Sequence, residues 1–290
     1  MTIVFALCAD FVFGLGVALQ VRIATEAPRS DSLRFGLLVR LARRPMWLLG
    51  ILLEILGFAL YAAALAHGSL VLVQPLLMLD LVFTLAICAA ATRTPLAARD
   101  WAGVAATIVG VSVFLVAVAP ERSSVAVAGA AGWLMFVTTA AATAGAVAIW
   151  GRRSSGIRRS TLLAIAAGLA NGFMAVVTKA FAGELEHGVA QTLRSWQPYA
   201  VVVAGIFAML VVQSAYQTGH PSIVLPTINV VDPLVSVLVG VLLFGETLTL
   251  TGFRSVAFVA SIALAIAGLV VLSRNPLVQP EEVAVAEPSR

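Results

Sequence analysis

Nine long apolar runs constrain this chain more than any other feature of its sequence. They lie between charged or turn-forming breaks and cover approximately 2–21, 46–66, 70–91, 100–119, 127–150, 160–182, 197–217, 222–243 and 252–272. A helix needs about 20 residues to cross the roughly 30 Å apolar core of a bilayer. The sequence therefore predicts an all-α integral membrane protein with about nine transmembrane helices.

The composition excludes an ordinary soluble domain. Apolar residues make up 61% of the chain and charged residues 11%, whereas soluble domains have about 45–50% and roughly 25%. The sequence pI of about 9.7 does not indicate a nucleic-acid-binding protein, because the basic residues are spread between the apolar runs and form no single patch. We expect the lipid bilayer as a partner and no nucleic acid.

The basic residues also predict the orientation of the chain. With nine spans, one side of the membrane receives fourteen of them and the other side four: Arg122, Lys179, Arg194 and Arg254. The side richer in Arg and Lys is normally cytoplasmic. The sequence thus predicts a multi-pass protein of the cytoplasmic membrane, with its N-terminus outside and its C-terminus inside.

Two stretches of the chain resemble each other. Aligning Pro75 with Pro226 also aligns Gly68 with Gly219 and places Asp80 and Asp232 one residue apart. Because the matching segments are five spans apart, the two halves would insert with opposite orientations, as an inverted-topology repeat. We expect a first repeat over 1–126, a linking helix over 127–150, a second repeat over 151–272 and a disordered cytoplasmic tail over 273–290.

Carboxylates lie near the middle of several predicted spans. Each costs about 2.5–3.5 kcal/mol at that depth, so we expect these side chains to face a polar cavity, pair with one another or bind a cation. Amide and hydroxyl groups share their helix faces. The candidate substrate- or ion-binding residues are Asp10, Glu54, Asp80, Asn171, Asn229, Asp232 and Ser236.

Three of these carboxylates, Asp80, Asp232 and Glu54, are the candidate metal ligands, because Mg²⁺ prefers oxygen ligands. The same groups could instead load and release a proton. The transported or coupling ion therefore stays open between Mg²⁺ and H⁺, and we expect no bound cofactor. Lys179 is a candidate counter-charge, and the sequence does not decide whether it pairs with a carboxylate or extends to the interface.

Three prolines interrupt the predicted spans: Pro75, Pro226 and Pro233. Each removes one helical hydrogen bond, and interrupted helices at matching places in two halves are typical of transporter binding sites. We expect these prolines to kink the helices and to take part in gating.

The stretch LLFGETLTLTGFRSVAFVASIALAIAGLVVL, Leu242–Leu272, resembles EamA-type members of the drug/metabolite transporter superfamily, in which an L-G-E-x-L turn precedes a helix that ends in A-G. GLANGFMAVVTKAF, 168–181, is similar to that family's repeat-opening helix, which closes on a lysine. Lys179 matches this lysine, and Gln20 replaces it in the first repeat.

Ten helices are the family norm, and the nine-span variant is similar to the NIPA-type magnesium transporters. RPMWLLGILLEILGFALYAAALAHGSLVLVQPL follows the pattern of that branch, but Phe58 stands where the branch has an acidic residue and Glu54 lies one turn earlier. The resemblance implies a permease, and these departures weaken its implication of magnesium specificity.

We therefore expect a secondary transporter that moves a small metabolite or cation by alternating access through a mid-membrane acidic cavity, with proton coupling as an option. A Mg²⁺ permease is the alternative, and a membrane scaffold without transport is a remote one. The chain lacks the HExxH, GxSxG and DDxxD motifs, so an enzyme is not expected. A homodimer stays open.

Overall fold

A computed structural model describes residues 1–25, 41–118, 129–185, 187–218, 220–246 and 252–278. Within these ranges the chain is helical and contains no strand. The helices are α1 (Thr2–Thr25), α3 (Pro45–His67), α4 (Leu70–Leu76), α5 (Asp80–Thr92), α6 (Ala98–Val118), α7 (Ala130–Arg153), α8 (Gly156–Leu185), α9 (Val189–Thr192), α10 (Gln197–Tyr216), α11 (Pro221–Phe244) and α12 (Phe253–Ser273).

The prediction of nine spans is confirmed for the described part of the chain, in which nine helical segments are long and apolar enough to cross a membrane. Helices α4 and α5, with the 3₁₀ turn η2 (Leu77–Leu79) between them, form one of these segments. A tight turn separates the second and third of these segments. It occurs because α3 ends at His67 and the Ser69 hydroxyl accepts a hydrogen bond from the Leu72 N–H, which caps the start of α4.

The third span is interrupted at mid-length. Pro75 lies inside α4, and after Leu76 the chain tightens into η2 before α5 begins at Asp80. A proline cannot donate the helical hydrogen bond and crowds the preceding turn, so an irregular turn at this place is its expected consequence. The interruption places Asp80 in the first turn of α5, where the positive end of a helix dipole favours a carboxylate.

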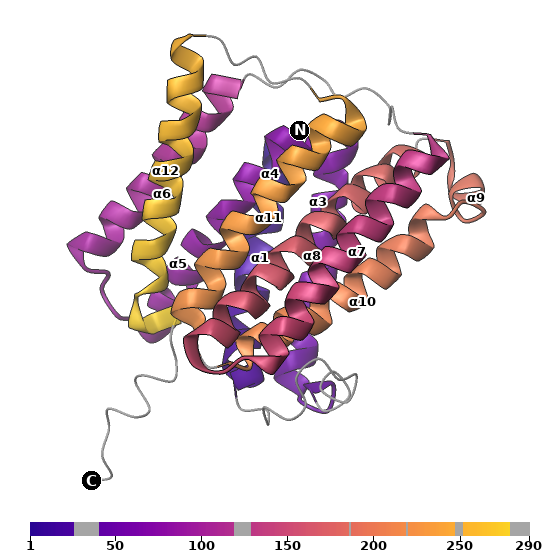
Figure 1. Cartoon of the computed structure of the whole chain (residues 1–290). Helices are drawn as coiled ribbons and strands as arrows, with labels where there is room; N and C mark the ends of the chain where they lie inside the picture. Colours follow the sequence, from indigo (N-terminus) through magenta and orange to yellow (C-terminus); the bar gives the residue numbers. More distant parts are fainter. Residues whose placement is uncertain (26–40, 119–128, 186, 219, 247–251, 279–290) are drawn as a thin grey trace.

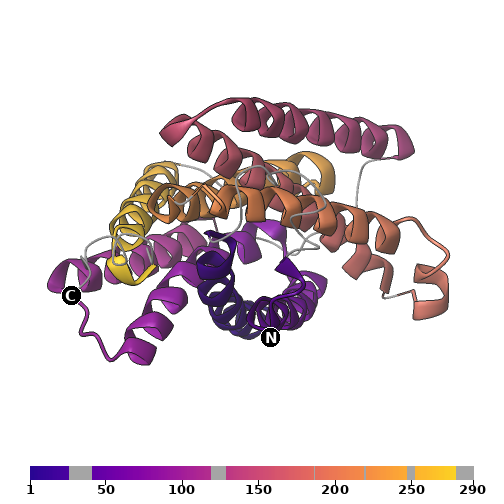
Figure 2. The same cartoon turned by 90° about the horizontal axis from the view of Figure 1, so that it is seen from below.

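The helices pair in a regular way. Helix α1 packs mainly against α3 and the α4–α5 span, while α8 packs mainly against α10 and α11. Helix α6 pairs with α12, and Figure 1 shows this pair at the left of the bundle. Helix α7 packs against the outer side of α8 and is the outermost helix at the top of Figure 2.

The α6–α12 pair depends on small residues. A Cβ at Gly268 would lie 2.3 Å from the Thr107 hydroxyl oxygen, and a Cβ at Gly110 would lie 2.6 Å from the Ala265 backbone nitrogen. Lipid tails are as apolar as the helices, so helix association in a bilayer depends on close backbone approach of this kind.

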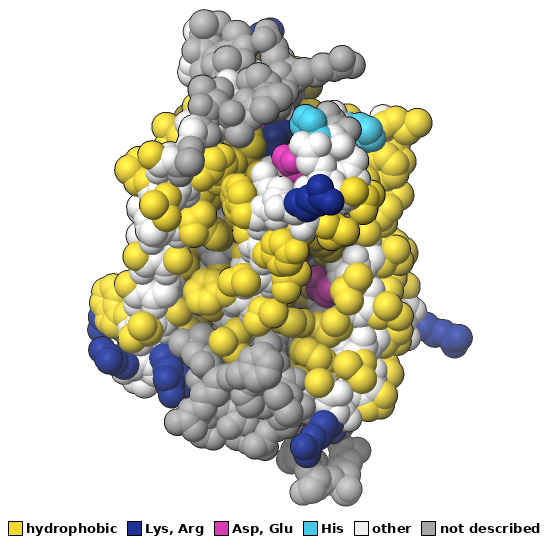
Figure 3. Space-filling view, turned by 90° about the vertical axis from the view of Figure 1, so that its right-hand side faces the viewer, with side chains coloured by type: hydrophobic (Ala, Val, Ile, Leu, Met, Phe, Trp, Pro, Cys, Tyr) yellow, Lys and Arg dark blue, Asp and Glu magenta, His cyan; other side chains and the backbone are white. Residues whose placement is uncertain are grey.

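On the face that Figure 3 shows, the described surface between the two ends of the bundle is largely hydrophobic, and most Lys, Arg and His side chains lie toward the upper and lower ends. This distribution suits a bilayer environment. The predicted start of the disordered tail, residue 273, is too early. Ser273 and Asn275 are buried, and a 3₁₀ turn, η3 (Pro276–Val278), packs against α5. Residues 279–290 lie outside the described part.

Candidate functional site

The carboxylates predicted at mid-depth come together around Asp80. Asp10 lies on α1, Glu54 on α3, Asp80 at the start of α5 and Asp232 on α11. The side chains of Asp10, Glu54 and Asp232 each lie within electrostatic range of Asp80. Four acids from four elements therefore form one cluster, which we call the acidic cluster.

Asp80 joins the two halves of the chain directly. The side-chain amide of Asn229 on α11 donates a hydrogen bond of 2.6 Å to Asp80 Oδ1. The Thr84 hydroxyl donates to the Asp80 carbonyl at 2.8 Å, one turn along α5. A Cβ at Gly14 of α1 would lie 3.1 Å from the same carbonyl, so α1 approaches closely. Asp80 is thus held between α1 and α11.

Asp232 lies where α11 packs against α8. The Ser236 hydroxyl, one turn away, donates to Asp232 Oδ1 at 3.1 Å. Helix α8 offers Gly168 and Gly172 to this contact, and a Cβ at Gly168 would lie 2.6 Å from Val231 Cβ. Asn171, next to Gly172, is half-buried. The glycines of α8 therefore allow the backbone of α11 to approach closely beside Asp232.

Asp10 and Glu54 differ in their surroundings. Asp10 is 0% exposed, and neither carboxylate oxygen has a hydrogen-bond partner among the described residues. Glu54 is half-buried, and a Cβ at Gly16 would lie 3.1 Å from its Oε1 atom, so its side chain contacts α1. A buried carboxylate without a partner is costly, which makes Asp10 the member of the cluster with the least compensation.

Three buried polar side chains beside the cluster were not among the predicted site residues. Gln74 is 0% exposed and its amide donates to the Tyr61 hydroxyl, which itself lies within electrostatic range of Asp232. Tyr216 of α10 lies within electrostatic range of Glu54 and Asp80. A glutamine inside an apolar run was the available signal for Gln74. The tyrosines gave none, because tyrosine is also common at membrane interfaces.

The described residues contain no group of three or more His, Cys, Asp or Glu side chains that could hold a metal ion. Asp80, Asp232 and Glu54 are therefore neighbours in this conformation without forming a ligand set. A cavity of about 40 Å³ lies between α4, α6, α11 and α12, bordered by Pro75, Met78 and Pro233. No carboxylate lines this cavity, while Glu54, Asp80 and Asp232 each remain partly exposed.

The three prolines do not act alike. Pro75 precedes the 3₁₀ turn η2, as a kink would require. Pro226 and Pro233 lie inside α11, which stays α-helical from Pro221 to Phe244. Gly219, which the repeat alignment pairs with Gly68, lies outside the described residues.

A second charged group lies toward one end of the bundle. Lys179 of α8 and Glu246, just after α11, are both buried, with Nζ and Oε1 3.4 Å apart. Lys179 also donates to the Gly68 carbonyl at 2.7 Å. Lys179 therefore pairs with a carboxylate, as one of the two sequence-based alternatives expected. Its partner, Glu246, was not among the predicted site residues.

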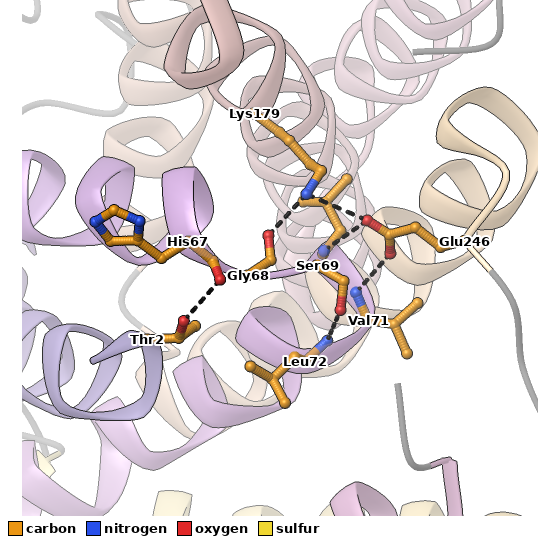
Figure 4. Close-up of polar contacts among 9 residues, drawn as sticks. Thr2, His67, Gly68, Ser69, Val71, Leu72, Lys179 and Glu246 are labelled. Atoms are coloured by element: carbon orange, nitrogen blue, oxygen red, sulfur yellow. Dashed lines mark hydrogen bonds and ion pairs between the residues drawn. The ribbon is translucent and has the colours of Figure 1, made fainter. Parts of the chain in front are cut away.

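Glu246 caps the first turn of α4. Its two carboxylate oxygens each accept a hydrogen bond of 2.9 Å, one from the Leu70 N–H and the other from the Val71 N–H, as Figure 4 shows. Gly245 ends α11 with a φ of 62°, a left-handed conformation that favours glycine. Gly240 leaves room for the carboxylate, since a Cβ there would lie 2.8 Å from Glu246 Oε2.

The Gly245–Glu246 turn thus has a structural explanation. It stops α11 and directs an acid toward the buried N–H groups of the first turn of α4, which have no partner within that helix; Glu246 and Leu70 are 176 residues apart in the sequence. We call Lys179, Glu246, Gly68 and the first turn of α4 the end cluster. It links α8 and α11 to α4.

Comparison with known proteins identifies a relative without a described activity. The chain is 25% identical over 278 residues to an uncharacterized protein of Corynebacterium glutamicum, and the match covers 95% of each chain. No family model matches the chain, and no solved structure matches it. The described residues form a helical protein with nine membrane-length segments, and the arrangement of their side chains is the basis for a functional assignment.

Proposed function

We propose that this protein is a secondary transporter that moves a small cation or cationic metabolite across the membrane by alternating access. The observation that carries this proposal is the acidic cluster, in which Asp10, Glu54, Asp80 and Asp232 converge from four elements of both halves. Carboxylates in a bilayer are rare and mark substrate, ion or proton pathways. A scaffold would need no such cluster.

An inverted repeat is part of the proposal, and the packing of the helices supports it. Helix α1 packs against α3 and α4–α5 in the way that α8 packs against α10 and α11. The span ending at Thr92 and the span ending at Phe244 are both followed by a residue in the left-handed conformation, Arg93 and Gly245. Helix α6 then corresponds to α12, and α7 links the halves.

This arrangement supports a mechanism of alternating access. The acidic cluster lies at the contact between α1–α5 and α8–α11, so rocking one unit against the other would open it from either side. The interrupted span α4–η2–α5 supplies a hinge beside Asp80. In the conformation described here, the end cluster connects the two units at one end, and we assign it as a closed gate.

The proposal has two versions, one with proton coupling and one with Mg²⁺ as the substrate. Proton coupling is favoured by Asp10, because a buried carboxylate without a partner is best tolerated when it is neutral. A Mg²⁺ permease is the alternative. It is favoured by the oxygen ligands of the cluster, since Mg²⁺ keeps several waters and needs only one or two carboxylates.

The experiment is uptake into proteoliposomes, recorded as substrate-induced current with Mg²⁺, spermidine and tetraphenylphosphonium as probes, with and without a proton gradient. We expect the intact protein to respond to at least one probe. Asp80→Asn and Asp232→Asn should lower that response to the level of empty liposomes while the monodisperse yield stays unchanged. Glu184→Gln, a carboxyl change outside the acidic cluster, is the matched control.

The result also separates the alternatives. A response to Mg²⁺ alone supports the magnesium permease. Full response in the Asp80→Asn/Asp232→Asn double variant would contradict the assignment of the acidic cluster, and silence of the intact protein toward every probe would count against transport of cations.

A further inference from the structure

A groove lies between α7 and α10, away from the acidic cluster. Its volume is about 560 Å³, within the range of about 300–1,000 Å³ that small-molecule sites occupy. Its walls are apolar and its open end is basic. The residues that the argument uses are Gly145, Ile149, Arg152 and Arg153 on α7 and Phe207 and Leu210 on α10.

The groove exists because α7 stands away from α10. Helix α7 packs along α8 at the edge of the bundle, as Figure 2 shows. Only 11% of the most apolar stretch of α7 is buried inside the protein, whereas 61% of the corresponding stretch of α8 is buried. A Cβ at Gly145 would meet no atom within 4 Å. The floor of the groove is therefore open space and is not a close helix contact.

The charge at the end of the groove is not neutralised within the described part of the protein. Arg152 and Arg153 form the last turn of α7, both side chains are exposed, and no ion pair with a described acid involves them. Arg158, just beyond them, lies over the ring of Trp150 at 4.9 Å. The guanidinium group binds phosphate oxygens in a two-pronged geometry.

An arginine-rich end of the bundle is accounted for by membrane orientation alone. Membrane orientation does not explain why an apolar groove lined by Gly145 extends to Arg152 and Arg153. An amphiphile with an acyl chain and a phosphate head group complements both parts. Anionic lipids are enriched on the cytoplasmic leaflet, and basic pockets between helices on that side bind their head groups.

We propose that the groove between α7 and α10 is a binding site for one anionic phospholipid. An acyl chain lies along Gly145, Phe207 and Leu210, and the phosphate contacts Arg152 and Arg153. The bound lipid fills the space between α7 and α10 and so fixes the linking helix against the second unit.

The test uses the whole protein in a non-ionic detergent, to which phosphatidylglycerol or phosphatidylcholine with identical acyl chains is added. Phosphatidylglycerol should raise the melting temperature by about 5 °C and remain attached in native mass spectrometry, and phosphatidylcholine should do neither. Arg152→Ala/Arg153→Ala should abolish both effects. Gly145→Phe should also abolish them by filling the groove, without a steric clash in the empty protein.

The charge-matched control is Arg99→Ala/Arg274→Ala, at exposed positions on the distant α6–α12 pair, and it should keep both effects. Equal responses to the two lipids, or an unchanged response in the α7 variants, would overturn the proposal. Equal protection by glycerol phosphate would also overturn it, because the groove would then bind only the phosphate group. So would a lipid-free dimer that Gly145→Phe dissociates, because the groove would then be a subunit contact. None of these readouts requires transport, so they do not depend on the proposed function.

Discussion

At the scale of single residues, the buried Lys179–Glu246 pair and the acidic cluster use charge in different ways. Lys179 and Glu246 compensate each other and also satisfy backbone groups of the turn at Gly68 and of α4. The acidic cluster contains four carboxyl groups, and in the described part of the chain no ion pair involves them; Asn229 and Ser236 are the donors to their side-chain oxygens. A buried ion pair stabilises one conformation, whereas acids in a membrane protein that have no cationic partner are able to bind a proton or a cationic substrate.

The end cluster gives the first prediction. Glu246→Ala should lower the free energy of unfolding by about 3 kcal/mol, because it leaves Lys179 as a buried charge and leaves two N–H groups of α4 unpaired. Lys179→Met should cost less, since Glu246 keeps both backbone hydrogen bonds. The measurement is unfolding in mixed detergent micelles.

The double variant Lys179→Met/Glu246→Ala provides the control. It should be more stable than the sum of the single changes predicts, with a coupling of about 1–2 kcal/mol. Strict additivity would show that the 3.4 Å approach contributes nothing.

At the scale of elements, the decisive feature is the interrupted third span. Hydropathy shows one continuous run from residue 70, and the structure divides it into α4, η2 and α5. Pro75 makes the interruption possible, and tertiary contacts decide that it occurs here and not at Pro226, which lies in the continuous α11. Asn229 and Gly14 meet the chain just where α5 begins.

The second prediction concerns this hinge. Pro75→Ala restores a helical donor and should let α4 continue toward α5, which would rotate Asp80 away from Asn229. We expect an unchanged or slightly higher melting temperature together with a loss of substrate-induced current. Pro226→Ala is the matched control and should keep more of the current. Equal effects of the two substitutions would show that the interruption has no special role.

The third prediction concerns the α6–α12 contact. Gly268→Leu should lower the free energy of unfolding by about 1–3 kcal/mol, because its side chain would meet Thr107 and the α6 backbone at less than contact distance. Gly145→Leu, where a Cβ meets nothing within 4 Å, is the control and should change stability little in detergent without added lipid. Thermal unfolding in detergent compares the two.

At the scale of the whole molecule, the odd number of membrane-length segments in the described chain places Met1 and the end of α12 at opposite ends of the bundle, as Figure 1 shows. Which end faces the cytoplasm is predicted from the distribution of basic residues. In the structure, Arg152 and Arg153 lie at the C-terminal end of α7. Arg194 lies in the turn between α9 and α10. Single cysteines at these ends can test the orientation.

The fourth prediction is the labelling pattern. In a background with Cys8→Ser and Cys88→Ser, a membrane-impermeant maleimide should label Arg194→Cys in whole cells. Arg274→Cys should react only after the cells are lysed. Both positions are exposed, so burial does not confound the result. The reverse pattern would invert the predicted topology and move the proposed lipid site to the outer leaflet.

The nine apolar spans and the positions of the carboxylates along them can be predicted from the amino-acid sequence alone. Both are properties of short stretches, because a bilayer of fixed thickness imposes the same length and polarity on every helix that crosses it. The ranges expected for α3, α10 and α12 therefore agree with the structure to within a few residues.

The contacts between polar groups could not be predicted in this way, because they form between helices that are far apart in the sequence. Glu246 had no depth signal because it lies beyond the end of its apolar run, and its partners Lys179 and Leu70 belong to other spans. Asp80 and Asn229 are 149 residues apart and meet through the rotation and tilt of α5 and α11. Such contacts depend on how side chains of two helices fit together, and no pattern along a single helix contains that information.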